Sequence, residues 1–275
     1  MKKIIKCIIK IFSKNLILFF SKFNSGRFFL DQISKNIFTK KKYVKHNNLE
    51  FNFYVPNRIN YFRAETFATK EPETLRWIDT FKKDSVFWDI GANVGLYSCY
   101  AAKSNGCKVY AFEPSVFNLE LLSKNIFINY LTDKITIIPF PITEKLGINT
   151  FNMSSIEWGN ALSTFGVNNI KKEKNKTDFF KYNMVGLSMN DCVKLLNLDK
   201  PNYLKIDVDG IEDLILKNSY DTLERAESIL VEVDNSFENQ AKNIQKYLSD
   251  AGFRIKEKQY LQIRGKNLQN QIWEK

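Results

Sequence analysis

Apolar and polar positions along this 275-residue chain alternate in a rhythm that predicts strands followed by helices. Continuous apolar runs predict buried strands at residues 85–90, 108–112, 135–139, 202–206 and 228–233. Helical spacing follows them at residues 93–102, 116–130, 189–196, 211–217 and 240–251. Two further strands are expected at 253–258 and 271–274. This order predicts a mostly parallel, doubly wound α/β sheet with ligands at the carboxyl ends of its strands.

Three regions lie outside this rhythm. Residues 47–60 alternate as a short strand or hairpin does, and Glu71-Pro72-Glu73-Thr74 opens a helix, since proline and carboxylates suit a first turn. Residues 140–186 contain extended runs at 148–153 and 179–185 around a lysine-rich stretch at 171–176, which we interpret as an inserted hairpin or lid. Its aromatic side chains either stack on a sugar or form the core of the lid: Trp158 (in Trp158-Gly159-Asn160), Phe165, Phe179, Phe180 and Tyr182.

The first 23 residues combine lysines with large apolar residues in a helical pattern. Lys3, Lys6, Lys10 and Lys14 form one cationic stripe. These lysines interrupt any uncharged run of ~18 residues that could span a membrane, and we find no signal-peptide cleavage site. Two interpretations remain open: a helix on an anionic membrane surface, and a helix packed on the body of the protein.

The net charge of +11 is confined to one end of the chain. Residues 1–48 hold eleven lysines and Arg27 against one acid, Asp31, so the remainder is neutral. We therefore divide the chain into a basic amphipathic segment, 1–48, and an enzyme domain, 49–275, and do not expect nucleic acid as its partner. Four cysteines without CxxC spacing argue for a reducing compartment, the cytoplasm, and against a zinc site. The single histidine, His46, excludes most histidine-dependent chemistry.

Acidic residues follow several of the predicted strands. Asp89 ends the first strand and leads into Gly91-Ala92-Asn93-Val94-Gly95, whose glycines permit a tight turn. Glu113 ends the second strand, where an acid is placed to accept both hydroxyls of a ribose. More acids follow the later strands: Asp207, Asp209, Glu232 and Asp234. The carboxyl ends of parallel strands meet, so we expect these acids at one edge of the sheet.

The kind of nucleotide that this edge would bind follows from its charge. The chain contains neither a GxGxxG run nor a GxxxxGK[ST] run. Clustered acids repel phosphates, but they attract a sulfonium cation and its amino group. These features predict S-adenosylmethionine as the cofactor.

These residues resemble the motifs of FkbM-type methyltransferases over about residues 60–235. The similar segments are KEPE at 70–73, VFWDIGANVGLYS at 86–98, AFEPS at 111–115, KIDVDGIE at 205–212 and ILVEV at 229–233. Asp209 departs from the family pattern, which has glutamate there. The resemblance implies a class I fold with a seven-stranded sheet, its last strand antiparallel, and methyl transfer usually to a hydroxyl oxygen. The patterns of residues 1–23 and 47–60 add an N-terminal helical and hairpin extension.

The resemblance also implies roles for residues of these motifs. Asp89, Gly91, Asn93 and Gly95 would frame the methionine part of the cofactor, with Ala92 between them. Glu113 would hold the ribose, with Pro114 beside it, and Glu71 would contribute to the pocket.

Methyl transfer to an alcohol requires a base that removes the proton as the new bond forms. Asp207 is our first candidate, because it ends the strand beside the cofactor strand, and Asp209 and Glu212 follow. Lys205 either orients the acceptor or pairs with an acid. Asp207 with Glu232 or Asp234 offers oxygen ligands to a divalent metal, but carboxylates at strand ends also occur without metals, and we predict none.

We therefore expect an O-methyltransferase acting on a saccharide, either a nucleotide sugar or a cell-surface glycan precursor. Two alternatives stay open: a methyltransferase of RNA or protein, and a non-catalytic module that binds S-adenosylmethionine. The expected partner is a small-molecule or glycan acceptor, with peripheral contact to an anionic membrane through residues 1–23. The expected location is the cytoplasm or the inner face of the membrane.

Overall fold

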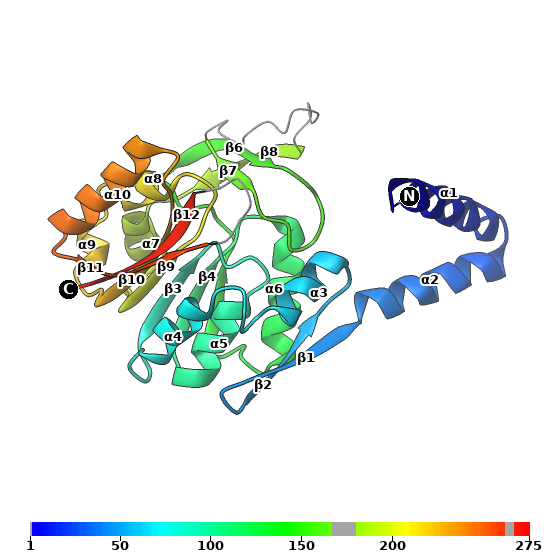
Figure 1. The fold of residues 1–275 in the computed structure, drawn as a ribbon, viewed down its shortest axis with the longest axis horizontal. Helices are drawn as coiled ribbons and strands as arrows, with labels where there is room; N and C mark the ends of the chain where they lie inside the picture. Colours follow the sequence, from blue (N-terminus) through cyan, green and yellow to red (C-terminus); the bar gives the residue numbers. More distant parts are fainter. Residues whose placement is uncertain (1, 167–179, 262–266) are drawn as a thin grey trace.

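A twisted seven-stranded sheet forms the centre of the molecule (Figure 1). The computed structural model describes residues 2–166, 180–261 and 267–275. The strand order is β11 (Arg254–Tyr260), β12 (Leu268–Glu274), β10 (Ser228–Asp234), β9 (Tyr203–Ile206), β3 (Val86–Ile90), β4 (Lys108–Phe112) and β5 (Ile135–Ile138). The strands from β10 to β5 pair in parallel, whereas β12 is antiparallel to both of its neighbours. This confirms the predicted class I fold.

Helices cover both faces of the sheet, and each face has its own apolar core. Side chains alternate along a strand, so neighbours such as Phe87 and Trp88 belong to opposite cores. One core includes residues of α4 (Pro72–Asp79), α5 (Leu96–Asn105) and α6 (Val116–Ile128). The other includes residues of α7 (Met189–Leu196), α8 (Glu212–Leu216), α9 (Tyr220–Leu223) and α10 (Glu238–Asp250). The carboxyl edge of the sheet lies between these two layers.

The region expected as a hairpin or lid contains a separate three-stranded antiparallel sheet. Its order is β7 (Ser163–Phe165), β6 (Gly147–Met153) and β8 (Phe180–Gly186). Phe151, Met153 and Phe165 are buried in the core that α7 and α10 share, so this sheet packs on the body. The predicted stretch 171–176 and Phe179 lie outside the described residues.

The N-terminal region differs from the prediction in three respects. The hairpin consists of β1 (Lys41–His46) and β2 (Leu49–Tyr54), so it starts before residue 47, and the expected boundary at 48 falls within its turn. The lysines of β1 are tolerated because one face of this two-stranded sheet meets solvent. Helix α3 (Arg58–Glu65) begins inside the stretch expected to be extended. Helix α2 (Asn24–Phe38) follows α1 (Lys2–Phe20), and these two helices project from the body as an arm (Figure 1).

Candidate cofactor and acceptor site

Two adjoining cavities open at the carboxyl edge of the sheet. The larger, about 190 Å³, is bordered by the ends of β3, β4, β9 and β10 and by residues 160–165 of the insertion. The smaller, about 60 Å³, lies between α3, the start of α5 and the end of β9. Both are lined by Arg63, Lys70, Gly91, Asn93 and Asp207, so these residues stand where the two cavities meet.

The loop after β3 requires glycine at two positions for steric reasons. Gly91 has a φ of +89°, and a Cβ there would lie 2.0 Å from the backbone oxygen of Asp207. Gly95 has a φ of +84°, and its Cβ would lie 2.4 Å from Cδ1 of Leu122. The two glycines therefore let the loop lie against β9 and α6 at once. Gly95 lines neither cavity and supports the loop from behind.

Glu113 joins this loop to the end of β4. One carboxylate oxygen accepts the backbone N–H of Asn93 at 2.8 Å, and the other accepts that of Ser115 at 2.8 Å. Burial raises the pKa of Glu113 to about 7. Oδ1 of Asn93 is buried and has no hydrogen-bond partner within the described part of the chain. Both residues line the larger cavity, and the carboxylate of Glu113 is a hydrogen-bond acceptor that fits the hydroxyl groups of a ribose.

Asp89 lies beneath the loop and lines neither cavity. Its Oδ2 accepts the hydroxyl of Ser98 at 2.5 Å, while its Oδ1 is one of the buried oxygens without a partner among the residues described. Asp89 is in register with Lys205 on β9. Burial raises the pKa of Asp89 despite the opposing charge of that lysine.

A chain of polar contacts runs along the smaller cavity. The Nζ of Lys205, which is fully buried, lies 2.6 Å from Oδ2 of Asp207. It also lies 5.3 Å from the ring centroid of Tyr97, whose hydroxyl donates to Glu71 at 3.1 Å. The other oxygen of Glu71 pairs with Lys70. Burial by itself raises the pKa of Asp207, but the Lys205 ammonium, together with the charges of Lys70 and Arg63, holds it below its ordinary value.

Glu232 stands beside Asp207 on the neighbouring strand. Ile206 of β9 is in register with Val231 of β10, so the residues that follow them, Asp207 and Glu232, are adjacent. Both carboxylates line the larger cavity. Burial, together with the charges of Asp207 and Asp209, raises the pKa of Glu232 well above its ordinary value. The ionised Asp207 and the more basic Glu232 thus face the same space.

Asp209 fastens the insertion to this edge. Its Oδ2 accepts the backbone N–H groups of Leu162 and Ser163 at 2.5 and 3.2 Å. Carbonyl groups of the same segment accept from the other side of the site: Arg63 donates to Gly159, and Asn93 donates to Asn160. Residues 159–163 are therefore held across the larger cavity by both walls.

Other predicted residues lie away from the cavities. Glu212 is buried and accepts from Gly210 N–H and from Gln240 at 2.6 Å, so it ties α8 to α10. Asp234 accepts from the backbone N–H of Ser236 and lines neither cavity. Of the three candidate metal ligands, Asp207 and Glu232 line the same cavity and Asp234 does not. No group of three or more histidine, cysteine, aspartate or glutamate side chains in residues 2–166, 180–261 and 267–275 is arranged to hold a metal ion.

The aromatic residues of the insertion have separate environments. Phe165 lines the larger cavity. The ring of Trp158 packs against that of Phe38 with 5.2 Å between the ring centroids, and its indole N–H donates to Glu120. Tyr182 donates to the carbonyl of Pro114, which is itself a lining residue.

Several residues that line the cavities were not predicted from the sequence. These include Arg63, Lys70, Tyr97 and Asn118. Lys70 and Tyr97 lie inside motifs that we recognised, so their proximity to Glu71 and Asp89 was a usable signal. Arg63 and Asn118 belong to helices without a local pattern that points to a ligand.

A parallel sheet of this order, with a glycine turn and carboxylates at its carboxyl edge, defines a class I methyltransferase. The chain matches the methyltransferase FkbM domain over residues 89–255 and belongs to that family. It is therefore a methyltransferase, and S-adenosylmethionine is its cofactor. The resemblance noted in the sequence motifs is confirmed.

Two curated relatives and one solved structure illustrate this similarity. Hexuronic acid methyltransferase AglP of Haloferax volcanii is 26% identical over 186 residues, which cover 66% of this chain and 69% of the relative. A tRNA (guanine(37)-N(1))-methyltransferase of Dictyostelium discoideum is 30% identical over 80 residues, or 29% of this chain and 17% of that protein. The crystal structure of methyltransferase FkbM from Methylobacillus flagellatus has a TM-score of 0.50 at 14% identity, covering 78% of this chain and 53% of that one. That likeness concerns the fold.

Proposed function

We propose that this methyltransferase transfers a methyl group to a hydroxyl oxygen of a saccharide, and that the sugar is acidic. The observation that carries the proposal is the pair of carboxylates, Asp207 and Glu232, side by side in the larger cavity. An alcohol acceptor needs one group to orient its O–H and one to accept its proton. The relative AglP is named as a hexuronic acid methyltransferase, which supports an acidic sugar as the acceptor.

The two carboxylates divide these tasks because their surroundings differ. Lys205 keeps Asp207 ionised, which makes it a steady hydrogen-bond acceptor but also weakens it as a base. We therefore assign to Asp207 the orientation of the acceptor hydroxyl. Glu232, whose pKa is raised, is the stronger base of the pair and takes the proton. This assignment moves the base from Asp207, our first candidate from the sequence, to its neighbour.

The cofactor supplies a methyl group on a sulfonium centre that carries positive charge. Glu113 would hold its ribose, because its carboxylate is a hydrogen-bond acceptor at the larger cavity, and Asn93 lines the cavity beside it. Glu71, Ala92 and Tyr97 line the smaller cavity, where the methionine part would lie. Gly91 lies at the junction and keeps the loop close to Asp207.

Arg63 supports the acidic character of the sugar. Its Nε donates to the carbonyl of Gly159, which fixes the guanidinium at the border of both cavities. Arg63, Glu113 and Asp207 all line the larger cavity. The charge of Arg63 opposes the burial that raises the pKa of Glu113 and contributes to the lowered pKa of Asp207. A uronate carboxylate that enters this carboxylate-lined space needs a positive partner, and Arg63 would provide it.

The test measures transfer of a radiolabelled methyl group from S-adenosylmethionine to matched sugars. Nucleotide-linked glucuronic acid and nucleotide-linked glucose differ only in the carboxylate. We expect transfer to the uronic acid, and Arg63→Gln should raise the KM for that sugar while it leaves the KM for S-adenosylmethionine nearly unchanged. Equal transfer to both sugars, or methylation of RNA or protein alone, would contradict the proposal.

A further inference from the structure

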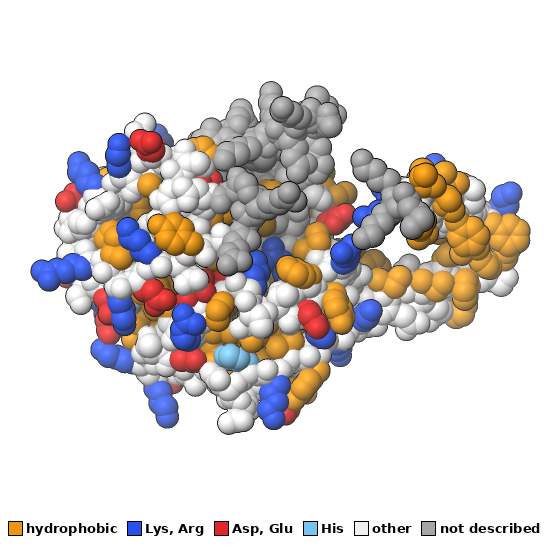
Figure 2. Space-filling model, viewed as in Figure 1, with side chains coloured by type: hydrophobic (Ala, Val, Ile, Leu, Met, Phe, Trp, Pro, Cys, Tyr) orange, Lys and Arg blue, Asp and Glu red, His pale blue; other side chains and the backbone are white. Residues whose placement is uncertain are grey.

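We propose that the α1–α2 arm binds the surface of an anionic lipid bilayer. Large apolar side chains of α1 are 42–66% exposed, although such residues are normally buried. They are Ile4, Ile5, Ile8, Ile9, Ile11, Phe12, Leu16, Ile17, Leu18 and Phe19. Figure 2 shows hydrophobic side chains gathered along the projecting arm. A continuous exposed apolar surface of this kind marks an interaction site.

The lysines of α1 show what kind of surface the arm fits. Lys6, Lys10 and Lys14 repeat at four-residue intervals and share one side of the helix. Ile8, Phe12 and Phe19 lie on the opposite side. A helix with one apolar and one cationic side lies along a bilayer, with its apolar side among the acyl chains and its lysines at the headgroups. No helix in the described ranges of the chain is long and apolar enough to cross a membrane.

Charge favours anionic lipid over a second copy of the chain. Residues 1–40 carry eight lysines and Arg27 against one acid, Asp31. Two arms packed together would bring these cations close to each other, whereas anionic headgroups neutralise them. Lipid binding therefore covers the apolar surface and compensates the charge at the same time.

A defined elbow keeps the two helices of the arm together. The ring of Phe20 packs against those of Phe23 and Phe29, at centroid distances of 6.0 and 5.0 Å. Gly26 allows this contact, because a Cβ there would lie 2.1 Å from the carbonyl oxygen of Phe20. Phe29 and Ile33 continue the exposed apolar surface onto α2.

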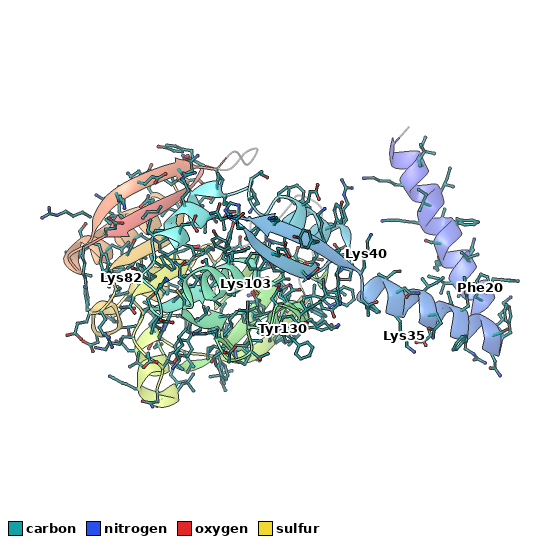
Figure 3. All side chains as sticks on the ribbon, turned by 90° about the horizontal axis from the view of Figure 1, so that it is seen from below. Phe20, Lys35, Lys40, Lys82, Lys103 and Tyr130 are labelled. Atoms are coloured by element: carbon teal, nitrogen blue, oxygen red, sulfur yellow. The ribbon has the colours of Figure 1, made fainter. Side chains whose placement is uncertain are left out.

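The arm joins the body beside the larger cavity. Figure 3 shows Phe20 at the elbow, Lys35 along α2 and Lys40 where the arm meets the body. At that end, Phe38 contacts Trp158, which immediately precedes the segment that is held across the cavity. A docked arm would thus bring the site close to the lipid surface. This last step rests on the proposed function and would suit a sugar carried on a lipid.

Flotation with lipid vesicles tests the arm without any measurement of methyl transfer. The full chain is mixed with two kinds of vesicle. One is phosphatidylcholine alone, and the other also contains about 30% phosphatidylglycerol, whose anionic headgroups attract lysines near the surface. We expect flotation with the anionic vesicles only. The variant Lys6→Glu/Lys10→Glu/Lys14→Glu should bind them about 100-fold more weakly. The control Lys194→Glu/Lys246→Glu/Lys258→Glu makes the same charge change on exposed positions of the body and should bind normally.

A second variant separates the apolar contribution from the charge. Ile8→Ser/Phe12→Ser keeps every lysine and should also lose flotation, because charge alone does not insert a helix. Three results would overturn the proposal: no binding by the intact chain, equal binding to neutral vesicles, or undiminished binding by both variants. A dimer that Ile8→Ser/Phe12→Ser dissociates, or RNA binding that the glutamate variant abolishes while vesicle binding is absent, would assign the arm to another partner. A failure of the sugar assay would leave the vesicle result unaffected.

Discussion

The ammonium of Lys205 and the carboxylate of Asp207 form a 2.6 Å ion pair in which the lysine is buried and the carboxylate is one-third exposed. A buried lysine ordinarily loses its charge, because burial disfavours the ammonium. Here the charges of Asp207, Asp89 and Glu71 outweigh burial and raise the pKa of Lys205 above its usual value. The lysine is therefore a permanent positive charge at the smaller cavity, and it lowers the pKa of Asp207, which borders both cavities.

Replacement of this lysine should impair transfer and alter its pH dependence. Lys205→Met removes a charge that lowers the pKa of both Asp207 and Glu232, so both pKa values rise and both carboxylates become protonated at a higher pH. We expect kcat to fall about 100-fold, within the range for loss of a positioned acid–base group. The acid limb of the kcat profile should move to higher pH. Steady-state rates between pH 5 and 9 measure both effects.

The matched control is Lys82→Met, which breaks a 2.6 Å ion pair with Glu227 on the exposed surface. It should leave the rate and the profile unchanged, because exposed pairs contribute little. An acid limb that stays in place in Lys205→Met would show that Lys205 does not control the ionisation of Asp207 and Glu232.

Cofactor binding should release a proton from Glu232. Burial and the neighbouring negative charges raise the pKa of Glu232 and so favour its protonated form in the free enzyme. A cation that enters the cavity opposes those charges and lowers the pKa. Affinity for S-adenosylmethionine should therefore increase with pH, and Glu232→Gln should abolish most of that increase. Calorimetry in two buffers of different ionisation enthalpy counts the protons released.

Glu238→Gln serves as the comparison for this experiment, because Glu238 is exposed at the start of α10. It should release as many protons as the unaltered enzyme. Equal proton release from Glu232→Gln and the unaltered enzyme would assign the titration to another group and weaken the case for Glu232 as the base.

The contact between Gly91 and β9 should make this glycine irreplaceable. Gly91→Ala places a Cβ 2.0 Å from the backbone oxygen of Asp207, so the loop must move away from the site. Gly252→Ala has nearly the same φ, +87°, but its Cβ meets nothing within 4 Å. The free energy of unfolding of both variants should fall by about 1–2 kcal/mol, because alanine is strained in the left-handed backbone conformation. Only Gly91→Ala should also lose S-adenosylmethionine binding. Denaturant unfolding measures the loss of stability, and calorimetry measures the loss of binding. Equal binding by both variants would contradict this steric role.

The centre of the sheet was predictable from sequence because its parallel strands are buried on both faces and appear as largely apolar runs, such as residues 86–90. Exposed elements give no such signal. The lysines of β1 conceal a strand that has one face in solvent. Strand β7, with three residues, is too short for periodicity to identify. Helix α2 was also missed, and Gly26 is its only fully buried residue.

The candidate site was partly predictable for a topological reason. Asp207, Glu113 and Glu232 converge because parallel strands end at one edge. Sequence proximity to a motif was less informative for Glu212, since the turn after Gly210 directs its carboxylate to α10. Arg63 reaches the site from α3, far from the motifs, and only the folded chain brings it there.

The buried carboxyl group of Glu113 should make the stability of the free enzyme depend on pH. Its pKa is about 7 in the folded state and near 4.5 when unfolded. The folded state therefore binds the proton more tightly, so this group favours folding below about pH 4.5, and its contribution is lost as pH rises through 7. The difference between these pKa values corresponds to about 3 kcal/mol.

Glu113→Gln mimics the protonated carboxyl group at every pH and isolates this contribution. The unaltered enzyme and the variant should have similar free energies of unfolding near pH 5, and the unaltered enzyme should become the less stable of the two by pH 8. Urea unfolding at intervals of half a pH unit measures the divergence. Added S-adenosylmethionine should stabilise the unaltered enzyme more than the variant, because a carboxylate accepts two ribose hydroxyls and an amide oxygen serves them less well. Parallel curves for the two proteins would mean that Glu113 is ionised in the folded state throughout this range, and that its two backbone hydrogen bonds outweigh its burial.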